Sequence, residues 1–167
     1  MRIAILSDIH DNVWNLAEAL KQVADTDTMI CCGDLCSPFI VAQLANGYAG
    51  PIHVVFGNND ADLYRITQIA GNFEHVNLHG EFLKTELAGK RFAVNHFDNI
   101  ALEMAGTEAA DVVCYGHNHV HKIERIGKTL TINPGPIMGY NPGAKQRVPA
   151  TFVVYDTLTD QATTGEA

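Results

Sequence analysis

Three histidines at alternate positions follow an apolar run in the stretch DVVCYGHNHVHK, residues Asp111–Lys122. His117, His119 and His121 would point to one face if the run continued as a strand, because side chains alternate between faces. Imidazole is a metal ligand and an acid–base group, so these residues could hold a metal. They could equally line a solvated strand face. The choice depends on which other polar side chains the fold brings to meet them.

Polar side chains also follow several other expected strands, at the point where each strand ends. The stretches SDIHDN, GDL, GNND, NHFD and GHNH supply Asp8, His10, Asp34, Asn58, His96, His117 and His119. Carboxyl ends of neighbouring parallel strands lie side by side, so loops distant in sequence converge there. Gly33, Gly57 and Gly116 each precede one of these polar residues, and we expect glycine to let the backbone turn sharply there. A lone Gly-Asp is usually a turn, but five such strand ends form a specific signal.

The seven side chains offer four imidazoles, two carboxylates and one amide oxygen. A single ion cannot use seven ligands in an ordinary site, but two ions can if one carboxylate bridges them. A mixed nitrogen and oxygen set without thiolate suits Mn²⁺, Fe, Zn²⁺, Ni²⁺ or Co²⁺ better than Ca²⁺ or Mg²⁺. We therefore predict two divalent metal ions as cofactors, with Mn favoured and Fe, Zn, Ni or Co as alternatives.

Strands and helices alternate in the first half of the chain. Short apolar strands are expected at residues 2–6, 28–32 and 52–56, and helices at 13–24, 38–45 and 62–70. Near-continuous apolar strands in this order predict a parallel sheet covered on both faces. The second half predicts a hairpin across residues 80–97, a helix near 99–105 and strands at 111–115, on either side of 127–128, and at 150–156.

The predicted fold class is α/β: a two-sheet β-sandwich flanked by helices, in a single domain spanning residues 1–167. The polar segment 157–167 is expected to be a loose tail. No apolar run has the ~20 residues of a membrane span, and the N-terminus lacks the features of a signal peptide. These features predict a cytoplasmic protein without a membrane partner.

The charge of the chain and the spacing of its cysteines limit the kinds of ligand that it can bind. The net charge is −8, and the 11 Lys and Arg are scattered among 19 acids, which disfavours long nucleic acid as a ligand. The four cysteines lack the paired spacing of a structural zinc site. We expect Cys31, Cys32 and Cys114 to be small buried residues. Cys36, in a loop near a candidate ligand, is expected to be the most reactive.

The five motifs D-x-H, G-D, G-N-x-D, H and G-H-x-H, followed by NPG at Asn133–Gly135, resemble those of the calcineurin-like metallophosphoesterases. The resemblance is closest to the small bacterial and archaeal phosphodiesterases and covers residues 2–156. It implies that one metal is held by Asp8, His10, Asp34 and His119. It also implies that Asp34 bridges to a second metal, which Asn58, His96 and His117 complete. His121 would then be a strand-face residue or a residue that supports a ligand.

By this resemblance, the protein is a dinuclear-metal phosphoesterase. A metal-bridging hydroxide would attack the phosphorus of small or nucleotide-like phosphodiesters. The rival hypothesis is a non-catalytic protein-binding scaffold, because a eukaryotic retromer subunit resembles this family and serves as one. A mononuclear site or another metallohydrolase is a third alternative. All seven positions here hold side chains that can bind metal.

The sequence departs from the family pattern near the site. Many relatives have a histidine at the position of Asn59, where it is thought to protonate the leaving group. An amide cannot do so, which predicts a preference for leaving groups of low pKa. Asp60 is expected either to orient a ligand imidazole or to cap the next helix. The segment 137–147, which contains Tyr140 and Arg147, is expected to be a mobile insertion near the site.

Overall fold

Strand β1 (Arg2–Leu6) shows how the sequence builds the layers of this fold. In the computed structural model, which describes residues 1–167, Ile3 and Ile5 face the second sheet, whereas Ala4 and Leu6 face helices. All four side chains are fully buried. A strand covered on both faces requires such an uninterrupted apolar run.

The first sheet has six strands in the order β13-β12-β1-β2-β3-β4. Strands β2 (Thr28–Cys31), β3 (Ile52–Val54) and β4 (Val76–Leu78) continue parallel from β1. Strand β12 (Thr151–Asp156) pairs antiparallel with the other edge of β1, and β13 (Gln161–Glu166) pairs antiparallel with β12. The predicted parallel arrangement of the first three strands is confirmed, whereas β4 had no counterpart among the predicted elements.

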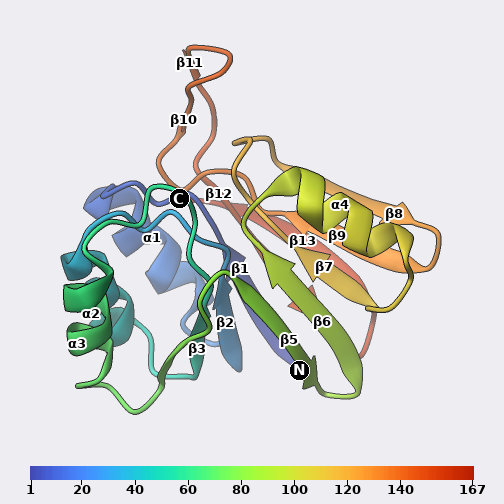
Figure 1. Cartoon of the computed structure of the whole chain (residues 1–167), viewed down its shortest axis with the longest axis horizontal. Coiled ribbons are helices and arrows are strands. Elements are labelled where there is room, and N and C mark those ends of the chain that lie inside the picture. The colour runs from blue at the N-terminus through green and yellow to red at the C-terminus, as the bar shows by residue number, and fades with distance from the viewer.

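Helices α1 (Val13–Val23), α2 (Pro38–Gly47) and α3 (Leu63–Ala70) cover the outer face of this sheet (Figure 1). Their apolar faces and the sheet enclose a core cluster of 20 buried residues. The longest of them, α1, has 11 residues. None of the four helices in the structure has the length and apolarity needed to cross a membrane.

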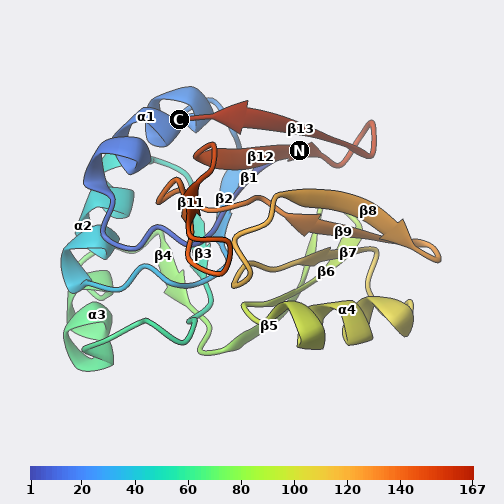
Figure 2. The same cartoon turned by 90° about the horizontal axis from the view of Figure 1, so that it is seen from above.

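The second sheet has five strands in the order β5-β6-β7-β9-β8. Their bounds are Phe82–Leu87 for β5, Lys90–Asn95 for β6, Val112–Cys114 for β7, Lys122–Ile126 for β8 and Thr129–Asn133 for β9. Helix α4 (Asp98–Gly106) covers its outer face, and the inner face packs on the first sheet (Figure 2). The predicted two-sheet sandwich flanked by helices is confirmed.

The prediction of a loose tail at residues 157–167 is wrong, because most of that segment is strand β13. A tight turn leads into it: Tyr155 Oη donates to Asp160 Oδ1 at 2.6 Å. The ring of Phe152 packs against Gly165, where a side chain would overlap it. Thr163 and Thr164 favour extended backbone, so a polar segment completes the sheet without forming an apolar run.

Residues 137–147, expected to be a mobile insertion near the site, contain a small hairpin of β10 (Tyr140–Asn141) and β11 (Gln146–Arg147). The hairpin stands away from both sheets (Figure 1). Its base is tied to the first helix, where Asn12 Nδ2 donates to the carbonyl of Met138 at 3.2 Å. The segment is therefore attached to the loops that follow β1.

Candidate metal centre

The loops at the ends of the strands hold their backbone in a conformation that most residues avoid. Asp8, His10, Asp34, His117 and His119 all have positive φ, between 43° and 70°. For residues other than glycine, this conformation costs about 1–3 kcal/mol each and persists only where the surroundings impose it. Such strain concentrates at functional sites. Five of the seven predicted ligands carry it.

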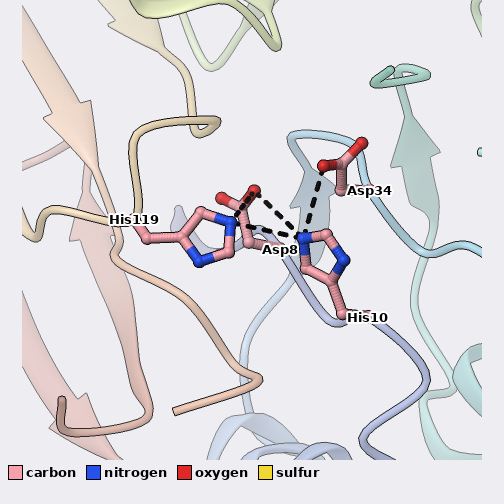
Figure 3. Close-up of side chains that lie close together, drawn as sticks. All are labelled: Asp8, His10, Asp34 and His119. Carbon is pink, nitrogen blue, oxygen red and sulfur yellow. Dashed lines mark hydrogen bonds and ion pairs between the residues drawn. The ribbon is translucent and has the colours of Figure 1, made fainter. Parts of the chain in front are cut away.

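Four predicted ligands form one tight group: Asp8, His10, Asp34 and His119 each offer an atom, and these atoms lie within 4.8 Å of one another. Figure 3 shows their side chains pointing toward one another, with Asp8 and His10 on the loop after β1 and Asp34 and His119 on two other loops. His10 Nε2 is 3.3 Å from Asp34 Oδ2 and 3.3 Å from His119 Nε2. His119 Nε2 is 3.2 Å from Asp8 Oδ1. Only His10 is partly exposed.

The remaining predicted ligands, Asn58, His96 and His117, form a second group next to Asp34. His96 Nε2 lies 3.4 Å from Asp34 Oδ2 and 3.2 Å from Asn58 Oδ1. Asn58 Oδ1 lies 2.9 Å from His117 Nδ1. The structure thus brings all seven predicted residues into one continuous cluster, in which Asp34 Oδ2 contacts both groups.

Three of the histidines have their outward ring nitrogen fixed by a partner. His96 Nδ1 lies 2.8 Å from the carbonyl of Cys32, and His119 Nδ1 lies 2.7 Å from the carbonyl of Tyr140. His10 Nδ1 lies 3.4 Å from Cys36 Sγ. A carbonyl partner makes Nδ1 the protonated nitrogen and leaves the Nε2 lone pair facing the centre, as a metal ligand requires.

Glycines make room for the carboxylates. A Cβ at Gly116 would overlap Ser7 Oγ and lie 2.5 Å from Asp8 Oδ2. A Cβ at Gly57 would overlap the Asp34 carboxylate, yet neither glycine has a positive φ. Of the three glycines noted in the sequence, only Gly33 has a positive φ, 101°. Glycine is therefore required at Gly57 and Gly116 by close packing and not by a positive φ.

The charges of the cluster depend on one another. Burial favours the neutral form of Asp8, but hydrogen bonds from His10 and His119 outweigh it and lower the Asp8 pKa to about 2. Burial likewise opposes charge on His10, but hydrogen bonds with Asp34 and Asp8 raise the His10 pKa to about 11. The pKa of Asp34 is lowered, against burial, by His10 and His96. Without metal, protons on the imidazoles neutralise the carboxylates.

The donor set fits divalent cations. Asp8 and Asp34 are buried, and neither forms an ion pair with lysine or arginine. His10 Nε2 and His119 Nε2 face each other at 3.3 Å, an arrangement that a shared cation satisfies better than two protonated rings. Positive charge at the centre of the cluster can come only from protons or from metal.

Asn59 and Asp60 both form hydrogen bonds with the loops that carry the predicted ligands. Asn59 donates its backbone N–H and its Nδ2 to the two oxygens of Asp34, each at 2.8 Å. Asp60 accepts from the backbone N–H groups of Gly57, Asp34 and Cys36 at 2.7 to 3.0 Å. Both readings of Asp60 are wrong: it contacts no imidazole, and Asp62 caps α3. Its carboxylate instead joins the loop after β2 to the loop after β3.

A set of amide side chains, which the sequence did not indicate, holds the loop between His117 and His119. Asn118 Nδ2 donates to Asp98 Oδ2 at 2.9 Å, and Asn133 Nδ2 donates to Asn118 Oδ1 at 2.9 Å. Asn141 Nδ2 donates to the carbonyl of His119 at 3.2 Å. Asparagine at loop positions gives no periodic signal, although Asn133 lies in the NPG motif. His121 lies outside the cluster and contacts Thr164.

The fold, the strained loops and this cluster of ligands define a metal-dependent phosphoesterase. The sequence matches the calcineurin-like phosphoesterase superfamily domain over residues 1–160, and the chain belongs to that superfamily. A phosphodiesterase from Methanocaldococcus jannaschii is 33% identical over 147 residues, which cover 86% of this chain and 88% of the relative.

Solved structures agree with this assignment. An archaeal phosphodiesterase superposes with a TM-score of 0.88 at 29% identity and covers the whole of both chains. Vacuolar protein sorting 29 from Cryptosporidium parvum has a TM-score of 0.67 at 17% identity, with 99% of this chain and 96% of that chain covered. The second likeness concerns the fold alone.

Proposed function

We propose that this protein is a dinuclear-metal phosphodiesterase that hydrolyses small phosphodiesters. One observation carries the proposal: Asp34 Oδ2 lies 3.3 Å from His10 Nε2 and 3.4 Å from His96 Nε2, so one carboxylate oxygen borders both groups of ligands. A bridging carboxylate is the feature that two-metal hydrolytic sites share. The relative and the solved structure described as phosphodiesterases support the choice of diesters.

The chain supplies the ligands for two cations. Asp8, His10 and His119 would hold one, Asn58, His96 and His117 the other, and Asp34 both. When bound, the two cations supply Lewis-acid stabilisation of the phosphoryl oxygens and lower the pKa of the attacking water. Asn59 orients the shared carboxylate by donating to both of its oxygens. The carbonyls of Cys32 and Tyr140 fix the rings of His96 and His119.

Metal content and turnover test the proposal together. The purified protein, loaded with Mn²⁺, should contain close to two ions per chain and should hydrolyse bis(4-nitrophenyl) phosphate. Stoichiometry is measured by elemental analysis and rate by release of 4-nitrophenol. An inert, metal-free protein would instead favour the alternative of a non-catalytic protein-binding scaffold.

Metal binding should release protons. The His10 pKa of about 11 in the metal-free protein means that this ring is protonated at neutral pH, and the ring must lose that proton to bind metal. Apparent affinity for Mn²⁺ should therefore rise with pH, by ~10-fold per pH unit for each proton released. Calorimetry in two buffers of different ionisation heat measures the number released.

The pair His53 and His79 provides a control for this proton release. His53 Nδ1 lies 3.0 Å from His79 Nε2, and neither ring contacts the predicted ligands. His53→Ala should leave the proton count unchanged, whereas His10→Ala should lower it. Binding heats that do not depend on the buffer would contradict the expectation.

The leaving group should strongly affect the rate. Asn59 occupies the position from which many relatives protonate the leaving group, and its amide instead donates to Asp34. Without a general acid, whose contribution is ~10²–10⁴-fold, alkyl diesters should react at least ~10²-fold more slowly than aryl diesters. Steady-state kinetics on a matched series of diesters measures the slope against leaving-group pKa. Equal rates on aryl and alkyl esters would refute this expectation.

A further inference from the structure

The hairpin of β10 and β11, with its flanking residues 139–148, projects from the molecule and is here termed the arm (Figure 1). The base of the arm is fastened to the metal centre. The carbonyl of Tyr140 accepts from His119 Nδ1 at 2.7 Å, and Asn141 Nδ2 donates to the carbonyl of His119 at 3.2 Å. The arm therefore has a defined position relative to a predicted metal ligand.

The arm is basic in an acidic protein. Lys145 and Arg147 are both exposed, and residues 134–150 contain no aspartate or glutamate, although the whole chain carries a net charge of −8. Seven of the other lysines and arginines form ion pairs with carboxylates, whereas Lys145 and Arg147 form none. Two unpaired cations on one projecting hairpin attract anions that approach the centre.

A cavity of about 450 Å³ lies between the arm and the start of α1. Its lining includes Tyr140 and Arg147 from the arm, Asn12 and Asn15 from α1, and the terminal Ala167. Arg147 pairs across the hairpin with Tyr140, whose carbonyl binds His119. Asn12 is two residues from His10. Tyr140 thus links the lining of the cavity to the predicted ligand His119. The one side-chain cation of the cavity is a guanidinium, whose planar donors match phosphate geometry.

We propose that the arm binds a second phosphate group of the substrate, an inference that rests on the proposed phosphodiesterase function. Arg147 contacts this phosphate in the cavity, and Lys145 adds longer-range attraction. The substrate class is then a small phosphodiester that carries a phosphate besides the diester to be cleaved, and a phosphorylated nucleotide ester is the probe of this class. A longer nucleic acid would meet the acidic remainder of the surface.

Two aryl nucleotides that differ by one group test the inference: thymidine 5′-(4-nitrophenyl phosphate), with and without a 3′-phosphate. Both present the same scissile bond and the same leaving group. The wild-type protein should prefer the 3′-phosphorylated ester by ~10-fold in kcat/KM at low salt, a preference that should shrink as salt is added. Arg147→Ala should remove most of the preference, and K145A/R147A should remove all of it.

The ester without the 3′-phosphate is the internal control, because its kcat/KM should change less than ~2-fold in the arm variants. Lys84→Ala and Lys128→Ala remove cations that also lack ion pairs but lie outside the arm. Both should keep the full preference. A wild-type protein that hydrolyses the two esters equally well would overturn the inference. So would an Arg147→Ala variant that retains the full preference.

Binding separates failure of this inference from failure of the proposed function. Isothermal titration calorimetry measures this binding directly, without need of turnover. Thymidine 3′,5′-bisphosphate should bind ~10-fold more tightly than thymidine 5′-phosphate, and Arg147→Ala should abolish the difference. This result can stand even if no diester is hydrolysed, and equal affinities would overturn the inference. Glycerol in place of thymidine in both ligands shows whether the nucleoside is required.

Discussion

Asp34→Asn should reduce hydrolysis of bis(4-nitrophenyl) phosphate at least ~10³-fold, about 4 kcal/mol of transition-state stabilisation. The substitution keeps the shape of the side chain and the hydrogen bond from the backbone N–H of Asn59, but removes the charge that borders both groups of ligands. In this variant no carboxylate borders both groups of ligands. Kinetics at saturating Mn²⁺ measures the loss, and elemental analysis should show at most one ion per chain.

Asp111→Asn is the matched control for Asp34→Asn. Asp111 pairs with Arg91 at 2.7 Å on the surface, in the loop before β7 and away from the cluster. Activity and metal content of this variant should remain within ~2-fold of the wild type, because exposed ion pairs contribute little. If Asp34→Asn keeps more than a few per cent of the activity, Asp34 does not bridge two ions.

Gly116→Ala should lower both activity and stability. The added methyl group would overlap Ser7 Oγ and approach Asp8 Oδ2 to 2.5 Å, in a region where Ser7 and Asp8 are fully buried. Overpacking of this kind costs ~1–3 kcal/mol of unfolding free energy. A shift of Asp8 of about 1 Å should reduce kcat/KM by ~10²-fold. Thermal unfolding of the metal-free protein and steady-state kinetics measure the two effects separately.

Gly106→Ala provides the comparison for Gly116→Ala. Gly106 ends α4, and a Cβ there meets no atom within 4 Å. Activity should be unchanged, and stability should be equal or up to ~1 kcal/mol higher, because alanine restricts the unfolded chain more than glycine does. Equal losses in the two variants would show that the Gly116 effect does not arise from crowding of Asp8.

The convergence of the seven predicted residues could be inferred from the sequence because two simple rules coincide. Buried parallel strands are short apolar runs, and their carboxyl ends meet at one edge of a sheet. Asp8, Asp34 and Asn58 each follow such a run, so the order of the strands was enough to bring them together. His96 and His117 follow strands of the second sheet, and the family resemblance placed them in the same site.

The contacts that hold the ligands could not be inferred in this way. Asp60 and Asp62 are equally good helix caps by residue type. In the fold, Asp62 caps α3, whereas Asp60 accepts hydrogen bonds from three backbone N–H groups. Strand β13 could not be predicted, because an edge strand with a polar outer face has the composition of a loop. The role of Asn141 depends on the packing of a hairpin against a distant loop, which leaves no pattern in the sequence.

The pairing of β1 with β12 has a consequence for biosynthesis. One edge of β1 pairs with β2, which lies only about 25 residues later in the sequence. The other edge pairs with residues 151–156. During translation this buried strand therefore presents an open edge until residues 151–156 have left the ribosome. A nascent chain that stalls before β12 would expose that edge to other polypeptides. We therefore expect chaperones to bind the nascent chain rather than the folded protein.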